Sequence, residues 1–140
     1  MKFGKVLVLV TGSQSDSLAV SNASSLVMEH RGHLLILHVI LMERSLHLDA
    51  EVPDKFRRGE DILRIAENMV TAPHITIEAE LVQAREIGSA VVHEASARNM
   101  EATIIVAPPE EYLTHSTTPD ISYILQYAPG HVFLLREPLN

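Results

Sequence analysis

The chain has 140 residues and a formal net charge of −7, from 11 Lys and Arg against 18 Asp and Glu. This length predicts one domain that spans residues 1–140. An acidic chain gains little from the release of counterions from phosphates, which argues against a nucleic-acid partner. Cysteine is absent, which excludes disulfides, thiolate nucleophiles and cysteine-based metal sites.

The apolar segments are short. The longest apolar run, residues 34–42, contains a histidine and is far shorter than the about 20 residues of a membrane-spanning helix. The N-terminus lacks the pattern of a signal peptide. We therefore expect a soluble, cytoplasmic protein with no direct insertion into a membrane.

The first half of the chain alternates between two apolar patterns. Residues 5–11 and 34–40 are near-continuous apolar runs, typical of strands that are covered on both faces. Residues 16–31 have apolar residues at helical spacing, and Gly32 stands where a helix often ends. Residues 43–53 have no period and predict a loop. A further helix is expected over residues 54–70, capped by Asp54 and carrying Gly59 in its interior.

The second half continues the alternation. Residues 75–81 alternate between apolar and polar side chains, which predicts a half-exposed strand at a sheet edge. Residues 103–107 and 131–136 read as buried strands, 87–99 and 120–128 as helices, and 108–118 as irregular. Strands that alternate with helices predict an α/β fold with a five-stranded, doubly wound parallel sheet. Ligands of such sheets bind beyond the carboxyl ends of the strands.

Several segments match the motifs of one known family. Val10–Ser13 reads VTGS where that family typically has VDGS, and Leu35–Val39 contains its LHV. Ala128–Val132 reads APGHV, which fits its A-P-x-x-V, and residues 86–107 are also similar. Together these segments resemble the universal stress protein family. The resemblance implies strand order 3-2-1-4-5, an adenine nucleotide alpha hydrolase-like fold. It also implies a candidate ligand site at the rim of the sheet, at Thr11, Gly12, Ser13, Val39 and Pro108.

The phosphate-binding glycines of that family are missing. The nucleotide-binding branch has G-x-x-G, nine residues and then G-S/T at this place, whereas Pro108, Glu111 and Thr118-Pro119 stand at the glycine positions. Prolines offer no N–H group to a phosphate. Glu110, Glu111 and Asp120 add negative charge, and Thr118-Pro119-Asp120 is expected to cap its own helix. We therefore predict that ATP is not bound tightly and that any ligand is smaller, and uncharged or cationic.

The last predicted strand has an unusually apolar sequence for a sheet edge. An apolar edge favours pairing with another chain. In the resembled family the last strands of two subunits pair, so we expect a homodimer through Val132, Phe133, Leu134 and Leu135. The alternative is that helices and the C-terminal tail cover this edge.

Catalytic and metal motifs are not evident. The eight histidines show no ligand spacing, so structural roles are expected for them, His38 in a buried strand included, and no metal site. The serines fit caps and a polar helix face. A hydrolase built on His115 and Ser116 has little support, and no catalytic residue is assigned.

The sequence therefore predicts a non-enzymatic regulatory or interaction domain that needs no cofactor and forms a homodimer. Two alternatives remain open. One is a stress-response protein that binds AMP or ATP, with Thr11, Gly12 and Val39 holding ribose and adenine. The other is a cytoplasmic regulatory domain whose partner is a membrane transporter or another protein, because residues 43–53 resemble the corresponding segment of transporter-fused domains.

Overall fold

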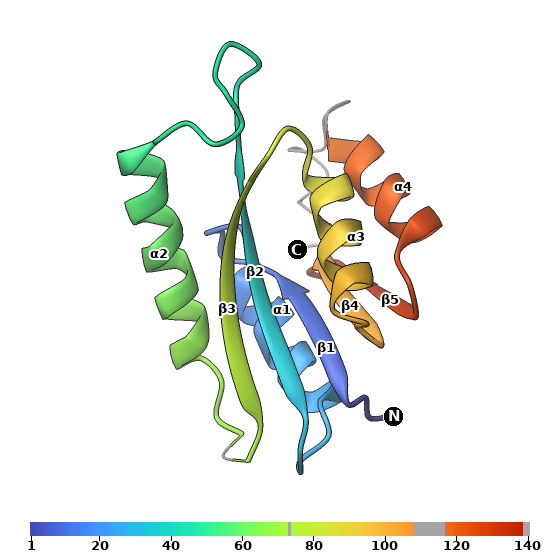
Figure 1. The fold of residues 1–140 in the computed structure, drawn as a ribbon. Coiled ribbons are helices and arrows are strands. Elements are labelled where there is room, and N and C mark those ends of the chain that lie inside the picture. Colours follow the sequence, from blue (N-terminus) through green and yellow to red (C-terminus); the bar gives the residue numbers. More distant parts are fainter. Residues whose placement is uncertain (73, 108–116, 139–140) are drawn as a thin grey trace.

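The computed structural model describes residues 1–72, 74–107 and 117–138 and contains a five-stranded sheet (Figure 1). In chain order the elements are β1 (Lys5–Leu9), α1 (Asp16–Leu26), β2 (His33–Leu41), α2 (Pro53–Asn68), β3 (Thr76–Ala84), α3 (Ile87–Ala97), β4 (Ala102–Val106), α4 (Thr117–Tyr127) and β5 (His131–Leu135). Neighbouring strands are parallel, in the order β3-β2-β1-β4-β5. The predicted fold class and strand order are confirmed.

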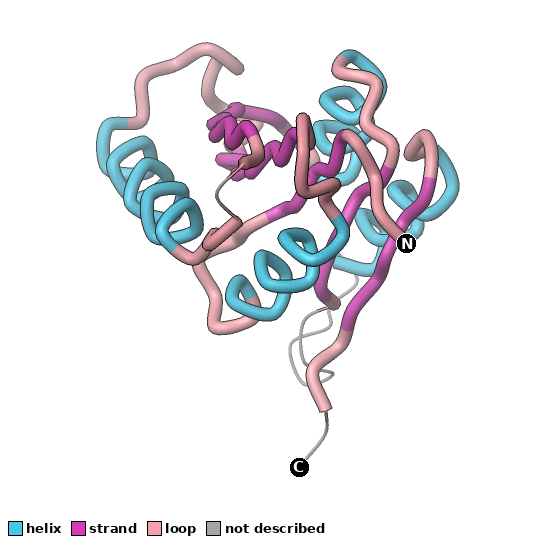
Figure 2. Tube along the Cα trace, turned by 90° about the horizontal axis from the view of Figure 1, so that it is seen from below, coloured by secondary structure: helices cyan, strands magenta, loops and turns pink. Residues whose placement is uncertain are grey.

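Helices cover both faces of the sheet (Figure 2). Successive residues of a strand point to opposite faces, so the core divides into two apolar clusters. Under α1 and α2 lie Val6, Val8, Leu34, Ile36 and Ile104, and under α3 and α4 lie Leu7, Leu35, Leu37 and Ile105. This double coverage explains the near-continuous apolar runs of β1 and β2. No helix in the described ranges is long and apolar enough to cross a bilayer.

Strand β3 lies at one edge of the sheet, as its alternation predicted. Its apolar face packs against the cluster under α2. Its polar face is tied to α3, because Arg98 at the end of that helix forms ion pairs of 2.9 Å with both Glu78 and Glu80. A third ion pair, 3.1 Å long, joins Arg98 to Glu94. Burial alone would lower the pKa of Arg98, but hydrogen bonds and charges from Glu80 and Glu94 raise it above its ordinary value.

Helix α1 ends at Leu26, earlier than the predicted Arg31. The physical reason is a contact with the N-terminus, where the Phe3 N–H donates to the Leu26 carbonyl at 2.7 Å. Phe3 also bridges to Val27, whose backbone is extended. Gly32 therefore does not end the helix, and this prediction was wrong.

Two further helix starts differ from the prediction. Asp54 does not cap α2, because Pro53 is already its first residue and the Asp54 carboxylate pairs with Arg57 at 2.5 Å. Helix α4 begins at Thr117, so Thr118 and Pro119 lie within its first turn rather than at a cap before Asp120.

The segment between β2 and α2 projects beyond the carboxyl end of the sheet (Figure 1). It contains no helix or strand, as expected. Side chains at the end of β3 hold it in place: the Gln83 Nε2 group donates to the carbonyls of Leu48 and Ala50, both at 2.9 Å. Arg85 Nη2 donates to the Leu46 carbonyl at 2.5 Å. The first turn of α2 is thereby brought back to the carboxyl ends of the strands.

Gly59 sets how closely α2 approaches the sheet. It is buried in the helix, and a Cβ atom there would lie 2.6 Å from a methyl group of Leu81 and 3.2 Å from the ring of His38. A glycine inside a helix costs about 1 kcal/mol in helix propensity. At this position the missing side chain is what allows the helix to pack against β2 and β3.

We expect Gly59→Ala to destabilise the protein even though alanine favours the helix. Overpacking a core costs about 1–3 kcal/mol, which exceeds the roughly 1 kcal/mol of propensity that alanine returns. Urea unfolding should show a lower free energy of unfolding for Gly59→Ala. The control Glu60→Ala, at the next and exposed position, should change it by less than about 0.5 kcal/mol. A Gly59→Ala protein more stable than the wild type would contradict the packing argument.

Candidate functional site

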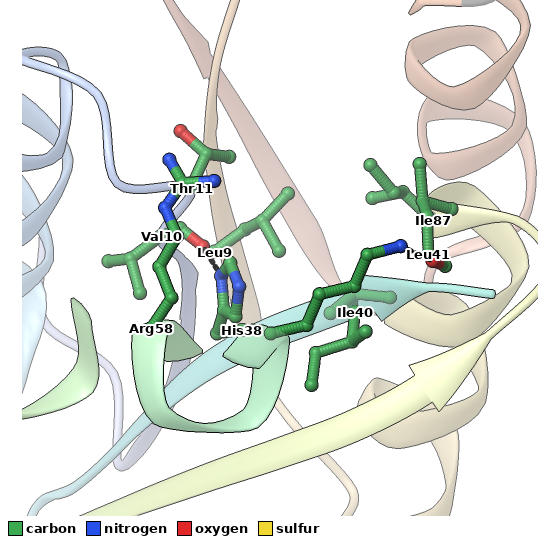
Figure 3. Close-up of a pocket in the computed structure, with 10 residues that line it drawn as sticks. Leu9, Val10, Thr11, His38, Ile40, Leu41, Arg58 and Ile87 are labelled. Carbon is green, nitrogen blue, oxygen red and sulfur yellow. Dashed lines mark hydrogen bonds between the residues drawn. The ribbon is translucent and has the colours of Figure 1, made fainter. Parts of the chain in front are cut away.

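A cavity of about 260 Å³ opens at the carboxyl ends of β1 and β2, between them and the first turns of α2 and α3 (Figure 3). It is lined by Leu9, Val10, Thr11, His38, Val39, Ile40, Leu41, Lys55, Arg58 and Ile87. Its place agrees with the rule for open parallel sheets. Its volume lies just below the about 300–1,000 Å³ of typical small-molecule pockets. The described part of the cavity therefore suits a compact ligand.

The predicted site residues are only partly brought together. Thr11 and Val39 line the cavity. Gly12 and Ser13 lie beside it in the turn after β1, where the Thr11 hydroxyl donates to the Ser13 hydroxyl at 3.1 Å. Gly12 has a φ of 86°, and a Cβ atom there would lie 2.7 Å from Ile62, so glycine is required in this turn. Pro108 lies outside the described residues.

A buried carboxylate holds this turn. Asp16, the first residue of α1, is 8% exposed. Its Oδ1 accepts the Thr11 amide at 2.9 Å, and its Oδ2 accepts the Gly12 amide at 2.7 Å. Hydrogen bonds to an ionised acceptor are about twice as strong as neutral ones. The first two main-chain donors of the turn, those of Thr11 and Gly12, are thus already used by the protein itself.

A second carboxylate has a similar role at α3. Asp120 of α4 accepts the main-chain amide of Gly88, the second residue of α3, at 2.8 Å. The sequence placed Asp120 on the dipole of its own helix. Asp120 does lie in the first turn of α4, and its side chain also joins α4 to the N-terminus of α3, beside Ile87 of the cavity wall.

Two cations of α2 face the cavity, and sequence reasoning missed them. Lys55 and Arg58 are three residues apart and share a helix face with Ile62. The Lys55 amine lies 3.4 Å from the Leu41 carbonyl. The Arg58 guanidinium lies 3.4 Å from the position that a Gly12 Cβ would take. The sequence signal that could have identified Lys55 and Arg58 is their spacing from Ile62, because it places both on the helix face that packs against the sheet.

Lys55 and Arg58 differ from Arg57 and Arg64 of the same helix in their ion pairing. Arg57 pairs with Asp54 and Arg64 with Asp61. Over the described ranges, neither Lys55 nor Arg58 contacts a carboxylate. The expectation of a wall that disfavours anions rested on Glu110 and Glu111, which lie outside the described residues, and on Asp120, whose carboxylate is bound to the Gly88 amide. The described wall carries positive charge instead.

His38 has the structural contact that its buried strand predicted, and it also lines the cavity. Its Nδ1 lies 2.8 Å from the Val10 carbonyl. A carbonyl can only accept, so Nδ1 carries the proton in this bond. Nε2 makes no hydrogen bond to the part of the chain that the structure describes. The contact joins β2 to the end of β1 directly below the turn.

Metal chemistry has no support in the described residues, where no three His, Asp or Glu side chains are placed to hold an ion. His30 and His74 stack with ring centroids 5.7 Å apart, at the amino ends of the strands. His115 and Ser116, the pair considered for a hydrolase, lie outside the described residues.

The Asp16 contacts predict a clear loss of stability in Asp16→Asn. An amide side chain keeps one acceptor and turns an NH2 group toward a main-chain donor, so one hydrogen bond is lost and a donor is left buried. We expect the free energy of unfolding to fall by about 1–3 kcal/mol, measured by urea unfolding.

The matched control is Asp54→Asn, at a first-turn side chain of α2 that is 94% exposed. Its free energy of unfolding should fall by less than about 1 kcal/mol. Equal effects at the two positions would show that the Asp16 carboxylate does not hold the turn.

No family model and no curated protein matches the sequence. Solved structures do match. A universal stress protein in complex with cAMP is 17% identical, with a TM-score of 0.69 over 95% of this chain and 98% of that chain. The universal stress protein of Archaeoglobus fulgidus in complex with dAMP is 13% identical, with a TM-score of 0.67 over 96% and 98%.

A universal stress protein family protein from Arabidopsis thaliana with AMP bound is 14% identical, with a TM-score of 0.62 over 97% of this chain and 93% of that chain. These three neighbours cover nearly the full length of both chains, at identities that establish architecture alone. The chain therefore has the fold of the universal stress proteins.

Proposed function

We propose that this chain is a non-enzymatic regulatory domain of the universal stress protein family that acts as a homodimer and does not bind ATP tightly. The observation that carries the proposal is the Asp16 carboxylate, which takes up the amides of Thr11 and Gly12. Main-chain amides in such turns are the usual partners of phosphates. In this chain a polyphosphate would meet a negative charge at that place.

Charge and size both oppose a triphosphate. Like charges about 4 Å apart repel by about 1 kcal/mol in water and about 4 kcal/mol at an effective dielectric of 20. The cavity of about 260 Å³ offers room for a compact group. The neighbours in complex with cAMP, dAMP and AMP hold nucleotides with a single phosphate. An adenine mononucleotide therefore remains the second candidate ligand, favoured by the cations of α2.

The absence of catalysis is supported by how the polar groups near the cavity are engaged. The Asp16 carboxylate is bound to amides, and the protonated nitrogen of His38 is bound to Val10. Covalent catalysis needs a nucleophile within reach of a base. Thr11 and His38 both line the described part of the cavity, but the Thr11 hydroxyl bonds to Ser13 and Asp16 and not to His38. A regulatory role, in which ligand binding changes a contact with a partner, fits this arrangement.

The homodimer is supported by the open edge at β5. The sheet order ends at this strand. Val132, Phe133 and Leu135 are half-buried, while Leu134 is 42% exposed. An unpaired apolar edge is a template for another strand. A second copy of the chain offers the matching edge, and two-fold pairing would satisfy both.

Calorimetric titration with ATP and AMP tests the ligand part of the proposal. We expect ATP to bind at least tenfold more weakly than AMP, because Asp16 takes the amides of Thr11 and Gly12 and its negative charge repels the extra phosphates. Cyclic dinucleotides serve as a further comparison in a thermal-shift assay. An ATP affinity equal to or above that of AMP would contradict the proposal.

A charge placed on the β5 edge tests the dimer. We expect the wild type to be a dimer by light scattering coupled to gel filtration, and Leu134→Arg to be a monomer, because a buried unpaired charge is costly. The control is Ile65→Arg, at a position of α2 that is 57% exposed and lies on the opposite side of the sheet (Figure 1). It should remain dimeric. If both variants are dimers, the dimer does not form through β5 and this part of the proposal is wrong.

A further inference from the structure

We propose that Lys55 and Arg58 form an anion subsite of the cavity, which holds the single phosphate or carboxylate group of a small ligand. The apolar part of that ligand would occupy the space between Leu9, Val39 and Ile87. The inference rests on the proposed function only in that the cavity binds a ligand. It names the part of the protein that recognises the ligand's charge.

The packing of α2 directs both cations to the cavity. Gly59, the residue after Arg58, lets the helix approach Leu81 and His38 closely. Arg58 then extends over Val10 and His38 toward Thr11 (Figure 3). Lys55, one turn earlier, ends at the Leu41 carbonyl. Both cations therefore line the same cavity, and both stay exposed to solvent.

Neither cation is compensated in the part of the chain that the structure describes. Arg57 and Arg64, on other faces of the same helix, each have an aspartate three residues before them. Lys55 and Arg58 contact no described carboxylate. An anion bound between them would gain charge-assisted hydrogen bonds.

The balance of charge indicates how much anion the subsite holds. Lys55 and Arg58 contribute two positive charges, and Asp16 and Asp120, bound to the adjacent turn and to α3, contribute two negative charges. With no excess of positive charge, the subsite suits one compact oxyanion better than a polyphosphate. Because Asp16 and Asp120 already take amides of the turn and of α3, side chains of α2 are the donors that a ligand anion meets.

A series of adenosine, adenosine-5′-carboxylate and AMP tests the subsite, because the three compounds differ in the charged group alone. Calorimetry on the wild-type protein should show affinity rising along the series. Lys55→Gln and Arg58→Gln should each weaken AMP at least fivefold and change adenosine less than twofold. The matched controls Arg57→Gln and Arg64→Gln should change neither compound by more than twofold. The carboxylate compound separates a general oxyanion site from one that requires phosphate.

A second probe does not depend on adenine. Inorganic phosphate, compared with chloride at equal ionic strength, should raise the Tm of the wild type and of Arg57→Gln, and not that of Arg58→Gln. The inference is overturned if adenosine and AMP bind equally to the wild type, if Arg57→Gln weakens AMP as much as Arg58→Gln, or if neither AMP nor phosphate binds. Tight ATP binding that is lost in Arg58→Gln would refute the proposed function and leave this subsite intact.

Discussion

The carboxylate of Asp16 is the contact on which the carboxyl end of this sheet depends. By taking two consecutive amides it fixes the turn after β1, with Gly12 in a conformation that only glycine adopts without strain. Because Gly12 has no side chain, Ile62 of α2 can pack directly against it. One buried acid thus determines both the shape of the turn and the position of the helix that closes the cavity.

This arrangement transfers the recognition of charge from backbone to side chains. In a turn with free amides, a bound anion can replace water on N–H groups that the fold supplies. In this chain the protein's own carboxylates hold those groups, and the cations stand on α2. Side-chain cations are longer and more mobile than amides, so the proposed subsite suits ligands that exchange readily.

The resemblance and the apolar patterns were sufficient to predict the sheet, because double burial leaves continuous apolar strands such as residues 34–40. The ends of the helices were harder to predict, because contacts between residues distant in the sequence determine where a helix stops. Phe3 stops α1 by bonding Leu26, and nothing within residues 16–31 reports that contact. The ion pairs of Arg98 with Glu78 and Glu80 were not predicted for the same reason, because the partners belong to a different element of the chain.

The candidate site was predicted only in part for a related reason. Thr11 and Val39 follow from the rule that sites lie at strand ends. Lys55 and Arg58 belong to a helix, and their direction depends on how deeply Gly59 lets that helix pack. The charge of the wall was predicted from Glu110, Glu111 and Asp120, whereas the cations that line the described cavity belong to α2.

The most direct test of this account is a crystal structure of the protein with AMP. The account predicts that the phosphate lies between Lys55 and Arg58 while Asp16 keeps its bonds to Thr11 and Gly12. A phosphate bound by the amides of Thr11 and Gly12, with Asp16 displaced, would contradict it.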